Sequence, residues 1–185
     1  MRFSSLSVLA ASAVSLSLGS AAAAEPGPGD SPCGEAPPPP LAVPAGNALA
    51  FSLEAEGVQI YACTANGASF GWALRAPEAK LSEASGRAAG THYAGPTWES
   101  IDGSKVVGAK LQAASPDATA IPWLLLRAAS HAGSGRMAEV TFVQRIRTKG
   151  GLPPQQGCDA AHAGAITRVP YRAAYCFYEK GAAPR

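Results

Sequence analysis

The stretch Gly57-Val58-Gln59-Ile60-Tyr61-Ala62-Cys63 alternates with a period of two. Successive side chains of an extended chain point to opposite faces, so Val58, Ile60 and Ala62 share one face. Gln59, Tyr61 and Cys63 share the other. This alternation predicts a β-strand near residues 58 to 64.

A partner strand follows closely in the sequence. Asn66-Gly67 is a dipeptide typical of tight hairpin turns, and Phe70-Gly71-Trp72-Ala73-Leu74 resumes the alternation. We therefore expect a hairpin made of strands near 58 to 64 and 69 to 75. Residues 76 to 87 are expected to form a loop, or at most a short helix.

The middle of the chain predicts further strands. Asp102-Gly103 is a second hairpin dipeptide, flanked by strands at 97–101 and 105–112. The apolar run from Ile121 to Ala129 is too short to cross a membrane and fits a central strand covered on both faces, with a buried helix as the alternative.

The C-terminal part predicts two more strands. In Ala138 to Thr148, Val140, Phe142 and Ile146 are expected on one face, and Gln144 interrupts that apolar face. The last strand is expected at Val169 to Glu179, which is rich in aromatic residues. Seven to nine such strands without an amphipathic helix predict a single all-β domain, an antiparallel sandwich or barrel with long loops.

The N-terminal segments predict where the protein works. Residues 1–24 combine Arg2, an apolar stretch from Leu6 to Leu18 and a small-residue ending at Ala24, which is typical of a secretory signal peptide. Residues 25–44 are rich in proline and predict a stiff arm, and residues 45–185 are the β domain. The protein is therefore expected to be secreted or periplasmic, without a membrane anchor after cleavage.

Charge and cysteine content narrow the function classes. The chain has 15 Lys and Arg against 13 Asp and Glu, in no basic run, so we expect no nucleic-acid partner. Four cysteines predict two disulfides, with three pairings open. Their wide spacing, without a C-x-x-C pair, argues against a metal site. No cofactor-binding motif occurs, so no cofactor is expected. The oligomeric state is left open.

The polar chemistry is concentrated between His92 and Gly108. His92 with Glu99 or Asp102 could act as the base and acid of a hydrolase. However, strand residues seven apart face opposite sides, so a simpler assignment is available. In it, His92 bonds a loop backbone, Glu99 faces solvent and Asp102 forms the Asp-Gly turn. Whether the protein is an enzyme is left open.

Aromatic residues provide a second functional hypothesis. Tryptophans and tyrosines line many small-ligand and carbohydrate sites, although in a β domain they also fill the core. Gln144 could be a placed polar group of such a site or a satisfied core amide. We predict non-catalytic binding of a small molecule or glycan, with a secreted hydrolase or a cell-surface interaction module using the proline-rich arm as alternatives. The predicted pocket residues are Gln59, Tyr61, His92, Tyr93, Trp98, Glu99, Trp123 and Gln144.

Several motifs resemble, in order, a family of secreted bacterial and fungal proteins known as domain of unknown function 3455. They are Gly57-Val58-Gln59-Ile60-Tyr61, His92-Tyr93-Ala94-Gly95-Pro96-Thr97-Trp98-Glu99, Asp102-Gly103-Ser104, Ile121-Pro122-Trp123-Leu124-Leu125, Gln144-Arg145, Thr148-Lys149-Gly150-Gly151 and Val169-Pro170-Tyr171. The resemblance implies a secreted, mostly β single domain from about Pro44 onward and no assigned activity. It also implies that Cys63 pairs with Cys158, which leaves Cys33 to pair with Cys176.

Overall fold

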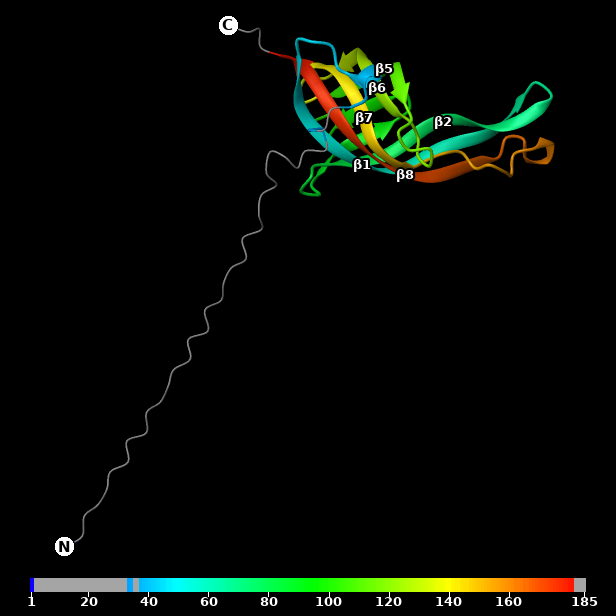
Figure 1. Ribbon diagram of the computed structural model, residues 1–185, viewed down its shortest axis with the longest axis horizontal. Coiled ribbons are helices and arrows are strands. Elements are labelled where there is room, and N and C mark those ends of the chain that lie inside the picture. The colour runs from blue at the N-terminus through cyan, green and yellow to red at the C-terminus, as the bar shows by residue number, and fades with distance from the viewer. Residues whose placement is uncertain (2–32, 35–36, 182–185) are drawn as a thin grey trace.

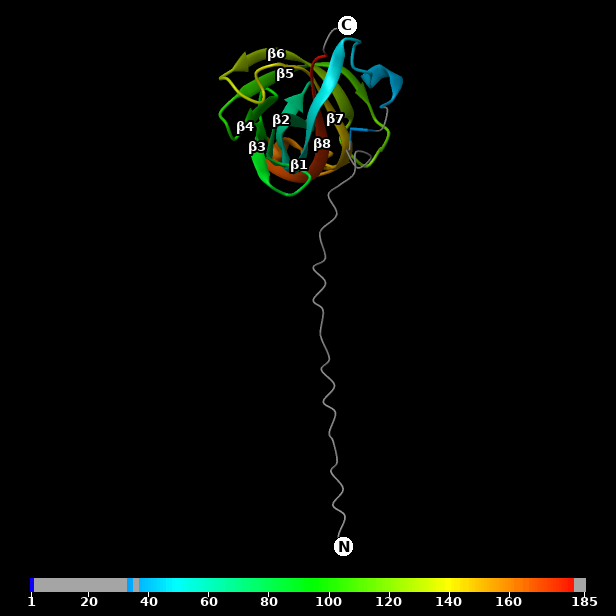
Figure 2. The ribbon, with the colours of Figure 1, turned by 90° about the vertical axis from the view of Figure 1, so that its left-hand side faces the viewer.

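Eight antiparallel strands close into one barrel, in which each strand pairs with the next in sequence and the last pairs with the first (Figures 1 and 2). The computed structural model describes residue 1, residues 33–34 and residues 37–181, so the predicted signal peptide lies outside the described residues. The barrel confirms the all-β prediction and decides between its two architectures. The strands are β1 (Asn47–Asn66), β2 (Ser69–Ser82), β3 (Ala88–Tyr93), β4 (Thr97–Ser100), β5 (Lys105–Ala114), β6 (Trp123–Ala132), β7 (Val140–Gly150) and β8 (Ile166–Lys180).

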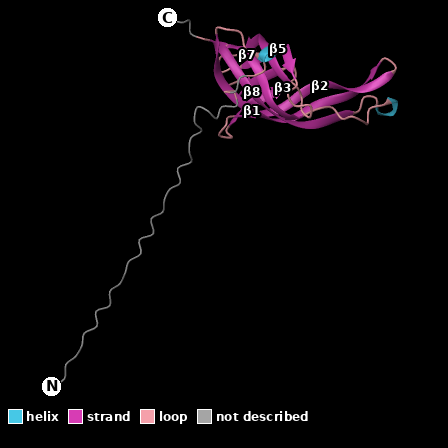
Figure 3. Ribbon diagram, viewed as in Figure 1, coloured by secondary structure: helices cyan, strands magenta, loops and turns pink. Residues whose placement is uncertain are grey.

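Helical structure in the described ranges is limited to two single turns, η1 (Pro39–Leu41) and η2 (Ala160–His162). Figure 3 shows how small a part of the described chain they form. No helix in these ranges is long and apolar enough to cross a membrane.

The predicted strands are confirmed, with two corrections. The expectation of a loop or helix at 76–87 is wrong, because β2 continues to Ser82 and pairs with β1 on one side and β3 on the other. In this segment Ala79 and Leu81 face inward while Glu78 and Lys80 face solvent. Alanine, glutamate and lysine favour strands weakly, so cross-strand pairing decides the conformation here.

The second correction concerns β7. Val140 packs in the barrel core, whereas Ile146 packs in a separate cluster outside the barrel, so the two do not share a face. The pairing of β7 with β8 shifts between Val140 and Phe142. An irregularity of this kind moves the side chains that follow it to the opposite face, here as far as the second shift between Ile146 and Lys149.

The inner face of the barrel has small residues on β1 and β2 beside large rings on β3 and β4. Gly57, Ala79, His92 and Trp98 are direct cross-strand neighbours on β1 to β4. A Cβ atom on Gly57 would lie 2.1 Å from the backbone oxygen of Glu78, so no side chain fits there. The small residues on β1 and β2 leave the barrel interior to the large rings of β3 and β4.

The described end of the proline-rich arm packs against the outside of the barrel. Leu41 is completely buried there. Its backbone oxygen accepts a hydrogen bond of 2.6 Å from Nε2 of Gln144, and Oε1 of the same amide accepts one of 2.7 Å from the Tyr178 hydroxyl. A disulfide from Cys33 to Cys176 in β8 fixes the arm a second time.

One end of the β1–β2 hairpin projects from the barrel together with the loop that precedes β8 (Figure 1). The Cys63–Cys158 disulfide links hairpin and loop, and Nε1 of Trp72 donates a hydrogen bond of 3.0 Å to the Gln156 oxygen. Both disulfides therefore have the pairing that the family resemblance implies.

Candidate functional site

The structure distributes the eight predicted pocket residues over three places. Four belong to the barrel interior, two lie on the outer face of β3 and β4, and two lie on the outer surface near the N-terminal arm. The four in the interior are Gln59, Tyr61, His92 and Trp98. The two on the outer face of β3 and β4 are Tyr93 and Glu99, and the two near the arm are Trp123 and Gln144.

His92 points from β3 into the barrel and is 2% exposed. Its Nδ1 lies 2.8 Å from the Thr97 backbone oxygen. Since that oxygen can only accept, Nδ1 donates the hydrogen and Nε2 keeps its lone pair. Burial lowers the pKa of His92 to about 3, the hydrogen bond to Thr97 opposes this shift, and the positive charge of Arg145 adds to it. The imidazole is therefore neutral at ordinary pH.

Glu99 lies on the opposite face of the sheet from His92. Its Oε2 accepts a hydrogen bond of 2.8 Å from the Tyr93 hydroxyl and lies 3.1 Å from Nζ of Lys105. Hydrogen bonds from Tyr93 and Lys105 lower the pKa of the Glu99 carboxyl. The sheet thus separates the imidazole from the carboxylate that the hydrolase hypothesis pairs with it.

Asp102 forms the turn between β4 and β5. Its carboxylate accepts hydrogen bonds from Ser104 N at 2.8 Å, Ser104 Oγ at 2.5 Å and Arg136 N at 2.9 Å. These hydrogen bonds lower the pKa of Asp102 to about 2, and the bond from Arg136 N has the largest effect. The carboxylate oxygens are thus used to hold two loops. No group of three or more His, Cys, Asp or Glu side chains within the described residues could hold a metal ion.

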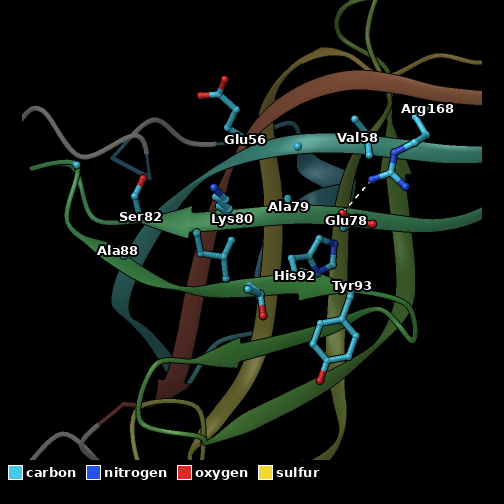
Figure 4. Close-up of a pocket in the computed structure, with 14 residues that line it drawn as sticks. Glu56, Val58, Glu78, Ala79, Lys80, Ser82, Ala88, His92, Tyr93 and Arg168 are labelled. Carbon is cyan, nitrogen blue, oxygen red and sulfur yellow. Dashed lines mark ion pairs between the residues drawn. The ribbon is translucent and has the colours of Figure 1, made fainter.

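A groove of about 930 Å³ lies on the outer face of β1, β2 and β3. Figure 4 shows the side chains that line it. An ion pair between Arg168 and Glu78, with an N–O distance of 2.9 Å, closes one side, and the Tyr93 ring closes another. The polar residues that line the groove are Glu56, Glu78, Lys80, Ser82, Thr91, His92, Tyr93 and Arg168, of which His92 directs its side chain into the barrel.

The groove includes only two of the predicted pocket residues, His92 and Tyr93. Glu78 and Lys80 were missed because their segment was expected to be a loop. The alternation Glu78-Ala79-Lys80-Leu81 is the signal that could have identified them, since it places both charges on one outer face.

The barrel interior holds four polar groups without a hydrogen-bond partner among the described residues, two of them on the predicted pocket residues Gln59 and Trp98. Tyr171 and Tyr175 of β8 are buried, and their hydroxyls have no hydrogen-bond partner. The same holds for Nε2 of Gln59 and Nε1 of Trp98. The spacing of Tyr171 and Tyr175, four apart on a strand, predicts that they share a face. It does not predict that this face is the inner one.

Comparison with known proteins identifies a family and no function. No curated protein and no solved structure matches the chain. A family model described as a protein of unknown function, DUF3455, matches residues 44–179, from just before β1 to the penultimate residue of β8. Since this match covers most of the chain and all but the last residue of the barrel, the protein belongs to the DUF3455 family.

Proposed function

We propose that this protein binds a glycan or a similar polyhydroxylated small molecule, without catalysis, in the groove on β1, β2 and β3. The observation that supports this most is the groove itself. Its volume of about 930 Å³ is within the range of roughly 300 to 1,000 Å³ that is typical of small-ligand sites. Pairing along the strands holds its floor, so the site is largely formed before a ligand arrives.

The chemistry of the groove suits an uncharged polar ligand. Arg168 is paired with Glu78, and the neighbouring Arg172 is paired with Glu56 at 2.9 Å, so most of the charge is already balanced. Paired carboxylates and guanidinium groups still offer hydrogen-bond acceptors and donors at their free edges. Sugar hydroxyls need both, and the Tyr93 ring adds an apolar surface against which a sugar face can pack.

Binding fits the geometry better than hydrolysis does. His92 is neutral, and its Nδ1 hydrogen is used by the Thr97 oxygen. Glu99 lies on the other face of the sheet, and Asp102 is bonded within its turn. None of these groups is placed beside another in a way that moves a proton to or from a substrate.

The proposed site of action is the periplasm or the extracellular medium. Two disulfides support this, because such bonds persist in oxidising compartments.

The test is a titration of the oxidised protein with a panel of oligosaccharides by calorimetry. Tyr93→Ala should weaken binding about tenfold, because it removes the apolar surface of the groove. Glu78→Gln should weaken binding by a comparable factor. Glu139→Gln, an exposed carboxylate outside the groove, is the matched control and should bind like the wild type. The proposal fails if no oligosaccharide binds, or if binding survives both groove substitutions unchanged.

A further inference from the structure

Arg145 lies on the inner face of β7, directly across from Tyr175 of β8. Its guanidinium donates from Nε at 3.1 Å and from Nη2 at 2.8 Å to one acceptor, the backbone oxygen of Pro122. A guanidinium has five N–H donors, so one carbonyl oxygen leaves most of them unused. Arg145 is only partly buried, so part of the residue remains accessible to solvent.

The charge of Arg145 has no counter-ion in the described part of the chain. By contrast, Arg168 forms an ion pair with Glu78 and Arg172 one with Glu56, each at 2.9 Å. Among the described residues, no carboxylate lies within ion-pair distance of Arg145. A charge that is partly removed from water is normally paired, so this arrangement is unusual.

Unsatisfied polar groups lie around the same end of the barrel. The hydroxyls of Tyr171 and Tyr175 and Nε2 of Gln59 are buried and have no hydrogen-bond partner. Buried polar atoms without a partner are rare in folded proteins, so these three, with Nε1 of Trp98 as a fourth in the same interior, call for an explanation. Gln59 and Tyr171 are close to each other, since a Cβ atom on Gly151 would lie 3.2 Å from Cγ of Gln59 and 2.8 Å from Cβ of Tyr171.

The electrostatics connect these groups to Arg145. Burial raises the pKa values of Tyr171 and Tyr175, and the charge of Arg145 opposes this shift on both. Weaker interactions also join the Tyr171 hydroxyl to that of Tyr175, and the Tyr175 hydroxyl to Arg145, although none of them has hydrogen-bond geometry. Burial raises the pKa of Tyr61 and lowers that of His92, and the charge of Arg145 acts to lower both. The positive charge therefore acts on all four side chains. The tyrosines stay protonated, so their hydroxyls can donate hydrogen bonds.

Segments from two loops close this end of the barrel. The Tyr61 hydroxyl donates a hydrogen bond of 2.6 Å to the Gly151 oxygen. The Thr148 hydroxyl donates one of 2.6 Å to the Ile121 oxygen, and Ile121 N donates to the Gly150 oxygen. These hydrogen bonds hold the loops in place across this end of the barrel.

From these contacts we propose that the barrel interior binds a small oxyanion beside Arg145, held by the guanidinium and by the hydroxyl and amide donors of Tyr171, Tyr175 and Gln59. The guanidinium fork matches two oxygens of a carboxylate or of phosphate. The site is separate from the outer groove and does not depend on the function proposed for it.

The experiment is calorimetric titration of the oxidised protein with sodium formate, sodium acetate and sodium phosphate. We expect saturable binding of at least one of them. Arg145→Gln should weaken it at least tenfold. The matched control is Arg127→Gln, which removes an exposed arginine from the neighbouring strand β6 and should not change the affinity. Preference for formate and acetate identifies a carboxylate ligand, and preference for phosphate a tetrahedral one.

Tyr175→Phe keeps the proposal testable if Arg145→Gln does not fold. This variant removes only the hydroxyl and should weaken binding about tenfold while the protein still unfolds cooperatively. A crystal structure of the protein grown with the best-binding anion should show that anion within hydrogen-bond distance of Arg145. The proposal is overturned if none of the three anions binds saturably. It is equally overturned if Arg145→Gln and Arg127→Gln bind alike, or if only water is found at Arg145.

Discussion

The rings of His92 and Trp98 stack face to face across β3 and β4, with centroids 4.6 Å apart and planes inclined by 13°. Tyr175 of β8 meets this pair from across the barrel, with its ring 5.0 Å from His92 and 5.3 Å from Trp98. An imidazole in such surroundings is a packing element with a proton-binding site. Its main measurable property is the pH dependence that it gives to folding.

Stability should decrease as the pH falls from 7 to 5. The folded-state pKa of His92 is about 3, below its ordinary value of 6.5, so the unfolded chain binds a proton in this range and the folded chain does not. The contribution is fully present above pH 6.5 and is lost progressively as the pH falls toward 3. At pH 5 the loss should be about 2 kcal/mol.

Urea unfolding at pH 7 and pH 5 measures this difference. His92→Phe keeps an aromatic ring against Trp98 but cannot titrate, so most of the difference should disappear. His162→Gln, at an exposed histidine, is the control and should retain it. An unchanged pH dependence in His92→Phe would refute the assignment.

Gly57→Ala should be severely destabilising, by about 3 kcal/mol or more, because the added Cβ would meet backbone and side-chain atoms of β2 at 2.1 to 2.7 Å. Gly71→Ala in β2 is the matched control, since a Cβ there meets nothing within 4 Å. It should be neutral or stabilising by up to about 1 kcal/mol. Urea unfolding of the two variants measures their free energies of unfolding. An equal loss of stability in both would contradict the close packing of β1 on β2.

Gln144→Leu should cost about 1 to 3 kcal/mol, because it leaves the Leu41 oxygen and the Tyr178 hydroxyl without their partner. Gln112→Leu, at an exposed glutamine of β5, should change the free energy of unfolding by less than about 0.5 kcal/mol. Denaturant unfolding of both variants provides the measurement. A cost below that of the control would show that Gln144 does not hold the arm.

Removing the Cys63–Cys158 disulfide by a double alanine substitution should cost about 2 to 5 kcal/mol and loosen the projecting hairpin. The hydrogen bond from Trp72 to Gln156 lies beside this bridge, so the Trp72 indole N–H should exchange faster with solvent. The double alanine variant of Cys33 and Cys176 is the control, because that bridge lies on the barrel. Indole exchange, followed by NMR, should be unchanged there. Equal acceleration in both variants would argue against a local role for the bridge.

The alternation of side chains predicted most of the fold because it is a local property. Residues 57–63 and the turns at Asn66-Gly67 and Asp102-Gly103 lie where the pattern places them. The second half of β2 was not predictable in this way, because its alanines and charged residues favour a strand only when neighbours pair with them. The irregularity in β7 depends on pairing with β8, which no single stretch of sequence reveals.

The candidate site was harder to predict than the fold. Adjacent residues of a strand point to opposite faces, so His92 and Tyr93 of β3 lie on different faces, as do Trp98 and Glu99 of β4. One pocket on one face therefore does not contain all four side chains. Gln144 faces outward because of the β7 irregularity, and Arg145 faces inward for the same reason. Identifying the interior polar groups required knowing which strands are neighbours across the closed barrel.

The bridge between Cys33 and Cys176 has a mechanical consequence. It joins a residue ahead of the first strand to one near the end of the last strand, at a sequence separation of 143 residues. A tensile force applied to the two ends of the chain would pass through this covalent link and would not stretch the barrel between them. Single-molecule pulling on the oxidised protein should therefore release almost no contour length, and reduction should make the whole barrel extensible.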